Sequence, residues 1–408
     1  MIGSFEGGEA MERARLAALR APVKTVIPSS AREQRKPSTS QTPAALGYRM
    51  PAEWEPHVAT WVAWPHNRSD WPGKFAVIPW VYAEVVRQLA RVERVAIIVE
   101  DAAARRRALQ ILTDSGAKIE SLDFYLWPTN RGWTRDCGPI FLVSESRAQQ
   151  PVAITSWSFN AWAKYKDWQK DATIAGKVAR LLGVPEWRPT ISVNGRPRRV
   201  VLEGGSIDVN GRGTMLTTEE CLLSSTQQRN PGLGKSELEQ VFADYVGVRR
   251  VIWLGQGIAG DDTHGHVDDI ARFAAPDTVV ACVESDTADP NHEPLADNLR
   301  RLRAARDQDG APLRVIELPM PGPVVFRGQR LPASYANFYI ANRLVLVPTF
   351  NDPNDRRALE ILAGVFCDRE VVGIYCGDLV WGLGTLHCMT QQQPEVLGRW
   401  SSVVGQAP

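Results

Sequence analysis

One unit recurs through the chain: an amphipathic helix, a short loop and then a compact strand rich in β-branched residues. The units that we predict span residues 79–99, 101–127, 235–255, 294–319 and 354–376. Alternating helices and strands are typical of an α/β or mixed α+β fold. Five similar units fit pseudo-symmetric modules around one centre, and they fit an ordinary doubly wound sheet equally well, because periodicity does not separate the two.

The sequence divides into two regions at residue 46. Residues 1–46 have no sustained periodicity, and the segment 29–43 is polar and rich in helix breakers, so we predict a disordered N-terminal leader. No linker follows, which predicts one compact domain over 47–408. Within it, Asn-Gly in SIDVNGRGTMLTT (206–218) predicts a hairpin turn.

Composition excludes several classes of protein. The formal net charge is +1, which gives no electrostatic reason to expect nucleic acid or an anionic membrane as partner. No apolar run approaches the ~18 residues of a membrane helix, and arginines interrupt the N-terminus where a signal peptide needs an apolar core. Six cysteines without any Cys-x-x-Cys pair predict reduced thiols. We therefore expect a soluble, cytoplasmic protein.

A cysteine near the C-terminus lies in an unusual setting. The segment WGLGTLHCMTQQQP (381–394) places Cys388 behind a turn that contains Gly382 and Gly384. Glycines let the backbone approach a small ligand closely, so Cys388 is a candidate nucleophile. The alternative is a buried core cysteine in a strand, because most free cysteines are core residues.

Two acidic residues adjoin apolar strands. Asp136 in WTRDCGPIF (133–141) precedes the run IFLV, and it is either a carboxylate that faces a cationic substrate or half of an Arg-Asp pair that orders a turn. Glu203 in VVLEGGSIDV (200–209) follows Val-Val-Leu and meets two glycines. A carboxylate that is partly buried there needs a partner, which is either functional or structural.

The richest segment is GDDTHGHVDDIARF (260–273), with four aspartates and two histidines in nine residues. If it is extended, His264, His266 and Asp268 share one face, because side chains alternate with period two. A histidine beside carboxylates suits general acid/base catalysis. The alternatives are a metal site, with His292 or His387 as a further ligand, and a solvated acidic loop.

Together the four segments supply a thiol, an imidazole and at least three carboxylates. Hydrolysis of an ester or amide gains nothing from so many acids around a thiol. A guanidinium, by contrast, is a planar cation that carboxylates can bind by paired hydrogen bonds, and its central carbon stays open to sulfur attack. The residues therefore favour guanidine chemistry.

In this combination and order, the four segments resemble the agmatine deiminases and bacterial peptidylarginine-type deiminases of the guanidine-modifying (pentein) superfamily. The resemblance covers about residues 50–394 and includes FNAW (159–162), LTTEECLL (216–223) and ASYANFYIANRLVLVP (333–348). It implies a five-fold pseudo-symmetric α/β propeller and a single deiminase catalytic domain over 47–408. It implies no metal and no organic cofactor. The partner implied is a small guanidine molecule, with no nucleic acid and no membrane, and a homodimer is a compatible assembly.

The same resemblance implies roles for individual residues. Cys388 would be the nucleophile and His266 the general acid/base, oriented by Glu203. Asp136 and Asp268 would hold the guanidinium, and Trp133 would wall the pocket. The implied reaction converts agmatine to N-carbamoylputrescine and ammonia, a step towards putrescine, through a covalent thiouronium on Cys388.

The sequence leaves other functions open. They are a deiminase of peptidyl-arginine or of another guanidine, a zinc-dependent hydrolase that uses THGHVDD, and a binding protein without activity. The chain also departs from the usual family pattern. It has GLGTLHC where a run of glycines and Asn-Ile-His-Cys is common, Cys137 where serine is frequent, and His264 where asparagine is frequent.

Overall fold

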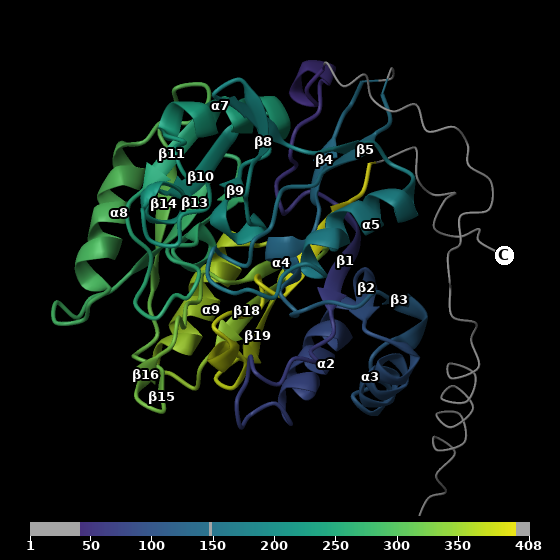
Figure 1. Ribbon diagram of the computed structural model, residues 1–408. Coiled ribbons are helices and arrows are strands. Elements are labelled where there is room, and N and C mark those ends of the chain that lie inside the picture. Colours follow the sequence, from purple (N-terminus) through teal and green to yellow (C-terminus); the bar gives the residue numbers. More distant parts are fainter. Residues whose placement is uncertain (1–40, 147–148, 397–408) are drawn as a thin grey trace, which may run out of the picture.

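Five small sheets with one shared strand arrangement form the framework of the protein. The computed structural model describes residues 41–146 and 149–396. In each of the five sheets an antiparallel strand pair is followed by a helix and then by a third strand, parallel to the middle one (Figure 1). In sheet order the strands are β20 (Thr390–Pro394), β1 (His57–Ala63) and β2 (Arg94–Val99); β4 (Ile140–Val143), β5 (Val152–Thr155) and β6 (Glu186–Trp187); β9 (Asp208–Val209), β10 (Thr214–Thr218) and β11 (Arg250–Leu254); β12 (Ala271–Ala275), β13 (Thr278–Val283) and β14 (Arg314–Pro319); and β17 (Tyr339–Ala341), β18 (Leu344–Thr349) and β19 (Glu370–Tyr375).

One helix crosses over from the second to the third strand of each sheet. In the same order these helices are α2 (Ile78–Leu89), α5 (Ile174–Leu182), α7 (Lys235–Val246), α8 (His292–Ala304) and α9 (Asn354–Val365). The first sheet also gains α3 (Ala102–Asp114) and β3 (Leu122–Leu126), while α4 (Thr134–Cys137) and α6 (Glu219–Leu223) are short. Two separate hairpins pair β7 (Thr190–Val193) with β8 (Arg196–Arg199) and β15 (Val325–Phe326) with β16 (Gln329–Arg330). The crossover helices α2, α5, α7 and α8 lie towards the outside of the molecule in Figure 1, whereas α4 lies near its centre.

The predicted helices and strands are confirmed, but their grouping is corrected in one place. The unit predicted at 101–127 forms no sheet of its own, because β3 pairs parallel with β2 and extends the first sheet. The remaining sheet lies instead between Ile140 and Trp187, where the strands are too short for a clear periodicity. The predicted Asn-Gly hairpin is confirmed as the antiparallel pair of β9 and β10.

The sheets and helices enclose two hydrophobic cores. In α2, Ile78, Tyr82, Val85 and Leu89 recur every three to four residues and are buried, which is the pattern of a helix that covers a sheet with one face. The larger core joins the first, fourth and fifth sheets, and the smaller one forms around α7. The site described below lies where polar side chains from all these elements meet.

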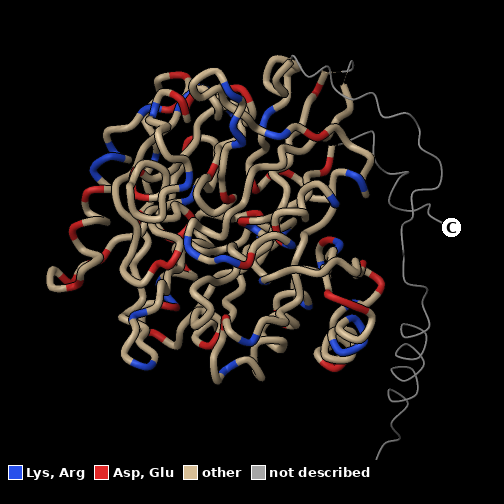
Figure 2. Tube along the Cα trace, viewed as in Figure 1, with Lys and Arg blue, Asp and Glu red and all other residues tan. Residues whose placement is uncertain are grey.

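The chain ends and the surface bear on the remaining predictions. Residues 1–40 of the predicted leader lie outside the described residues, whereas Ala44–Leu46 form a 3₁₀ turn. Basic and acidic residues are interspersed over the trace in Figure 2. Among the helices of 41–146 and 149–396, none is both long and apolar enough to span a bilayer. All six cysteines are free, as predicted.

Candidate active site

A cavity of about 500 Å³ brings together residues from distant parts of the sequence. Cys388, Asp136 and Trp133, three of the residues predicted for the site, line it together with Trp162 and Gly384. The pairing of β20 with β1 draws the C-terminal segment into the middle of the protein. As a result, residues about 250 positions apart meet at one wall.

Cys388 lies in the loop between the 3₁₀ turn Leu379–Gly382 and β20, and it is 6% exposed. Its carbonyl accepts a hydrogen bond from the Arg135 amide at 3.1 Å. A Cβ on Gly384 would lie 2.9 Å from the Trp133 ring and 3.1 Å from the Cβ of Cys388, so only glycine fits between them. The predicted glycine turn therefore sets the thiol against the cavity wall.

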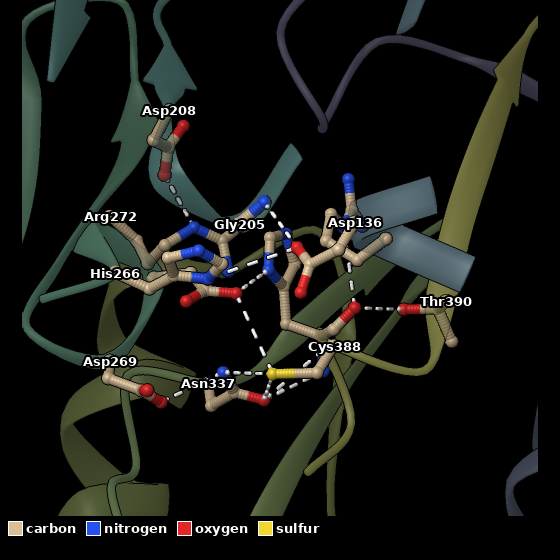
Figure 3. Close-up of polar contacts among 12 residues, drawn as sticks. Asp136, Gly205, Asp208, His266, Asp269, Arg272, Asn337, Cys388 and Thr390 are labelled. Atoms are coloured by element: carbon tan, nitrogen blue, oxygen red, sulfur yellow. Dashed lines mark hydrogen bonds and ion pairs between the residues drawn. The ribbon is translucent and has the colours of Figure 1, made fainter. Parts of the chain in front are cut away.

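Asn337 is the polar residue nearest to the sulfur in Figure 3 and was not predicted from the sequence. Its Nδ2 donates to Cys388 Sγ at 3.2 Å and to Asp269 at 3.0 Å. Its Oδ1 accepts from the His387 amide at 3.0 Å and from Thr385 Oγ1 at 2.7 Å. Asn337 thus fixes both the thiol and the loop that carries it.

Two carboxylates lie beside the thiol. Asp268 Oδ2 is 3.9 Å from Cys388 Sγ and accepts from His387 Nδ1 at 2.7 Å, while its buried Oδ1 has no hydrogen-bond partner among the described residues. Asp136 accepts from the Gly205 amide at 3.0 Å and from Trp162 Nε1 at 2.9 Å. Burial raises the pKa of Asp136, and it also raises the pKa of the Cys388 thiol well above normal, with the nearby aspartates adding to that rise. The thiol therefore stays protonated near neutral pH.

His266 lies between acidic groups on two sides. Its Nε2 is 3.6 Å from Glu203 and its Nδ1 is 3.8 Å from Asp136. Burial by itself would lower the pKa of His266, but the Asp136 carboxylate, together with Cys221 and Glu203, outweighs burial and holds this pKa well above normal. Burial likewise opposes ionisation of Glu203, yet Arg229 at 3.2 Å keeps the pKa of Glu203 below normal. The site thus holds a charged imidazole next to a fixed carboxylate.

Gly205 is what allows the imidazole and the two aspartates to converge. A Cβ at this position would lie 2.6 Å from His266 Nδ1, 2.9 Å from Asp136 Oδ1 and 3.0 Å from Asp268 Oδ2. Gly205 has no left-handed φ, so the requirement is purely one of space. One methyl group is therefore enough to separate these three side chains.

Gly205→Ala should lower kcat on the order of 10²-fold, because displacement of a reacting group by about 1 Å costs that much. The measurement is steady-state ammonia release. Gly364→Ala is the matched control, since a Cβ on Gly364 in α9 meets nothing within 4 Å and the rate should not change. Equal rates for Gly205→Ala and wild type would show that the convergence is unimportant.

A buried ionic network supports the site from behind. Glu53 accepts hydrogen bonds from His387 Nε2 at 2.8 Å and from Arg135 at 3.1 Å, and it forms an ion pair with Arg272 at 2.9 Å. Although burial opposes ionisation, Arg272, with His387 and Arg135, holds the pKa of Glu53 well below normal. Sequence reasoning missed Glu53 and gave His387 no role other than as a metal ligand. The network orients His387 and, through it, Asp268.

His264 does not share a face with His266 and Asp268, so that expectation was wrong. The segment is not extended: His264 and Gly265 have φ of 64° and 92°, and Val267–Asp269 form a 3₁₀ turn. The imidazole of His264 instead lies 3.1 Å from Ser224 Oγ, away from the cavity. This position also argues against the metal site predicted from THGHVDD. Two local expectations are corrected as well, since Asp136 lies in the short helix α4 and Glu203 precedes a 3₁₀ turn rather than ending a strand.

His264→Asn should change kcat/KM by less than about threefold, because the side chain contacts no group of the cavity and asparagine tolerates the left-handed conformation. His266→Asn is the contrasting variant and should lose most activity. Ammonia release under saturating and limiting substrate measures both. A strong defect in His264→Asn would restore the shared-face hypothesis.

The outer part of the cavity is acidic and aromatic. Asp70, Asp167 and Asp262 line it with Tyr165, and Arg131 is the cation among the lining residues. Tyr165 donates to Asp262 at 2.7 Å, and the Arg131 guanidinium lies over the Tyr165 ring at 4.4 Å. Burial raises the pKa of Asp70 to about 7 despite Arg131. The excess of carboxylates suits a ligand with a second positive charge.

Comparison with known proteins agrees with this geometry. The model of the family described as Porphyromonas-type peptidyl-arginine deiminase matches residues 49–394. An agmatine deiminase of Pseudomonas aeruginosa is 35% identical over 378 residues, which are 87% of this chain and 98% of that protein. The structure of an agmatine deiminase of Enterococcus faecalis is 33% identical with a TM-score of 0.79, covering 88% of this chain and 99% of that one. A C. jejuni agmatine deiminase with substrate bound is 28% identical with a TM-score of 0.73, covering 85% and 96%.

The family match, over residues 49–394, runs through every segment that builds the cavity, from β1 to β20. The chain therefore belongs to the Porphyromonas-type peptidyl-arginine deiminase family.

Proposed function

We propose that this enzyme hydrolyses agmatine to N-carbamoylputrescine and ammonia through a covalent intermediate on Cys388. The observation that carries the proposal is the position of a thiol at the cavity wall with Asp268 3.9 Å away and Asp136 in the same cavity. Carboxylates on either side of a guanidinium hold it by charge-assisted hydrogen bonds and leave its carbon facing the sulfur. The relatives named above are agmatine deiminases at about one-third identity.

The roles of the side chains follow from their places in the cavity. Asp136 and Asp268 bind the guanidinium nitrogens, and Trp133 packs against the planar group. Cys388 Sγ attacks the guanidinium carbon as its thiol proton passes to solvent, and His266 Nδ1, on the Asp136 side of the imidazole, protonates the departing nitrogen. The carbon–nitrogen bond breaks and ammonia leaves, so that an S-alkylthiouronium remains on Cys388.

Water completes the reaction. The imidazole of His266, now neutral, removes a proton from a water molecule, which adds to the thiouronium carbon. The carbon–sulfur bond then breaks, the ureido product leaves and Cys388 regains its proton. Glu203, held by Arg229, orients His266 and stabilises its charged form throughout the cycle. No metal or organic cofactor takes part in this scheme.

The acidic outer cavity supports agmatine over other guanidines. Agmatine carries an ammonium at the end opposite its guanidinium, and Asp70, Asp262 and the Tyr165 ring give that charge acidic and aromatic surroundings. The α-carboxylate of free arginine would meet the same acids and be repelled. Arg131, the cation in the lining, pairs with Asp167 at 3.0 Å and with Asp70 at 3.4 Å, and Asp262 pairs with Lys164, so the ammonium of agmatine would join these ion pairs.

The five sheets of equal connectivity support a pentein-type α/β propeller with five-fold pseudo-symmetry, built as one catalytic domain over 47–408. In such an arrangement each module contributes a segment to the centre. The contributions of Asp136, Glu203, His266, Asn337 and Cys388 fit that plan, because each residue adjoins a different sheet. The six free cysteines support a reducing, cytoplasmic location.

The test is ammonia release from agmatine, free arginine and an arginyl peptide under identical conditions, with Cys388→Ala as the control for chemistry at the thiol. We expect agmatine to have the highest kcat/KM. If the peptide is turned over faster, the enzyme is a peptidyl-arginine deiminase instead. Turnover that persists in Cys388→Ala and is lost with a chelator would favour a metallohydrolase.

The raised pKa of Cys388 leads to a pH prediction. In the free enzyme Cys388 should react slowly with iodoacetamide at neutral pH, followed on its own peptide because Cys367 is exposed, and its rate should rise only well above the ordinary thiol range, since only the thiolate reacts. A bound, non-reactive guanidinium places positive charge beside the sulfur and should lower this pKa. Thiolate ultraviolet absorbance against pH, as a difference from Cys388→Ala, measures the bound state. An apparent pKa that does not fall on binding would contradict activation by substrate.

A further inference from the structure

Besides Glu203 and Asp136, a third side chain lies close to His266, and the proposed reaction does not use it. Cys221, in α6, is 1% exposed, and its Sγ, a Glu203 carboxylate oxygen and a His266 ring nitrogen all lie within 4.8 Å of one another. Glu203 and His266 are themselves 0% and 1% exposed. A thiol, an imidazole and a carboxylate are thus gathered at one buried point behind the imidazole.

The backbone holds these groups in fixed positions. The Cys221 amide donates to Thr218 Oγ1 at 3.0 Å, and the same hydroxyl donates to the carbonyl of Gly265, the residue before His266. Thr218 therefore links α6, which carries Cys221, to the segment that carries His266. Glu203 is fixed independently by Arg229.

The imidazole is also unsatisfied. Neither Nδ1 nor Nε2 of His266 has a hydrogen-bond partner among the described residues, although the side chain is buried. Buried polar atoms are nearly always hydrogen-bonded. In the proposed reaction Nδ1 meets the substrate, which leaves Nε2, on the Glu203 side, as the nitrogen without an assigned partner among the described residues. This observation is independent of the clustering of the three side chains.

We propose that Glu203, Cys221 and His266 form a binding site for a thiophilic divalent cation, with Zn²⁺ as the best match, and that its occupancy inhibits the enzyme. Zinc commonly takes three protein ligands from thiolate, imidazole and carboxylate and keeps a fourth position open. At zinc bond lengths of about 2.0–2.3 Å, ligand atoms of a tetrahedral site lie roughly 3.3–3.8 Å apart. The 3.6 Å between His266 Nε2 and Glu203 Oε2 already has that length.

The charges around the site are compatible with a cation. As the cation binds, the Cys221 thiol and the charged imidazole of His266 each release a proton to solvent, and Glu203 and the new thiolate neutralise the two positive charges of the metal. Arg229 remains beside Glu203, but a carboxylate has about four lone-pair sites and can serve both. Asp136, 3.8 Å from the other ring nitrogen, adds negative potential.

Inhibition follows from which groups the cation occupies. A metal bound to His266 Nε2 and Glu203 separates the imidazole from the carboxylate that orients it, so His266 no longer transfers protons during turnover. Cys388 itself stays free. This set shares only His266 with the histidine-rich segment 260–273, since His264 takes no part and the other two ligands lie elsewhere in the chain. The binding site itself does not depend on the proposed function, but its inhibitory consequence does.

Binding is tested with Co²⁺ and Zn²⁺ on the reduced, full-length protein. We expect one equivalent of Co²⁺ to give a near-ultraviolet thiolate-to-cobalt charge-transfer band, which Zn²⁺ displaces. Cys221→Ala should remove the band and weaken Zn²⁺ binding by more than about 100-fold. Loss of a group that only supports a metal ligand weakens binding by up to about 100-fold, so a larger loss indicates that Cys221 is itself a ligand. Cys376→Ala, a buried cysteine in the core away from these groups, is the matched control and should bind as wild type does.

Three results would overturn the site. The first is the absence of a thiolate-to-cobalt band in the wild-type protein. This result needs no variant, so misfolding of a variant cannot explain it. Cys221→Ala could bind as tightly as wild type. Alternatively, Cys388→Ala could lose the band, which would place the metal on the nucleophile instead.

Inhibition is tested separately by ammonia release from agmatine at increasing Zn²⁺. Wild type should be inhibited and recover fully with a chelator, and Cys221→Ala, relative to its own rate without metal, should need at least 100 times more Zn²⁺. Zinc bound through Cys221 with no loss of rate would refute the inhibitory role. A wild-type protein that releases no ammonia from agmatine would refute the proposed function, while the cobalt spectra would still decide the metal site.

Discussion

Cys388→Ala should lower kcat by at least about 10⁴-fold, equivalent to more than ~5 kcal/mol of barrier, because no other group can form the covalent intermediate. The nearest hydrogen-bonding groups to the sulfur are the Asn337 amide and the Asp268 carboxylate, and neither replaces a thiolate as nucleophile. Steady-state ammonia release measures the loss.

Cys376→Ala is the control for removal of a buried thiol. Cys376 is fully buried in the core and does not line the cavity, so its loss should affect stability rather than kcat. Mass spectrometry of acid-quenched wild-type enzyme during turnover should show the adduct on the peptide that contains Cys388. An adduct on any other cysteine, or substantial turnover by Cys388→Ala, would contradict the proposed mechanism.

Asp136→Asn should reduce kcat/KM by roughly 150-fold or more, which corresponds to a loss on the order of 3 kcal/mol of transition-state stabilisation. The substitution keeps the shape of the side chain and removes the negative charge that would face the guanidinium. It also creates a local conflict. Both oxygens of Asp136 accept hydrogen bonds, from the Gly205 amide and from Trp162 Nε1, so an amide NH₂ must point at one of these donors.

A distant aspartate provides the control for this variant. Asp123 on β3 pairs with Arg94 on β2, and neither residue lines the cavity. Asp123→Asn should therefore leave kcat/KM nearly unchanged. Both variants need a check of folding by thermal denaturation, because Asp136 is buried. Near-normal kinetics of folded Asp136→Asn would remove this residue from the site.

Much of the fold and three of the residues that line the cavity could be predicted from the sequence, because periodicity and charge in apolar surroundings are local signals. Helices α7 and α9 begin where the pattern indicates, and Cys388, Asp136 and Trp133 line one cavity. The supporting groups carry no such signal. Glu53 lies 334 positions from His387, and their contact arises only when β20 pairs with β1.

Asn337 and His264 show two further limits. Asn337 has no charge, and the segment around it reads as an apolar strand, so its four contacts near the thiol leave no mark on the sequence. The period-two argument for His264 assumed an extended backbone. Gly265 signalled instead that the chain could turn left-handed at that point, and it does.

The protonated state of Cys388 also affects how long the enzyme survives in an oxidising or electrophile-containing medium. Peroxides and alkylating agents attack thiolates, and oxidation beyond the sulfenic acid is irreversible for most cysteines. With burial and its neighbouring aspartates keeping the sulfur neutral, the idle enzyme offers these reagents a poor target. Damage should therefore accumulate with the number of catalytic cycles rather than with the time in storage.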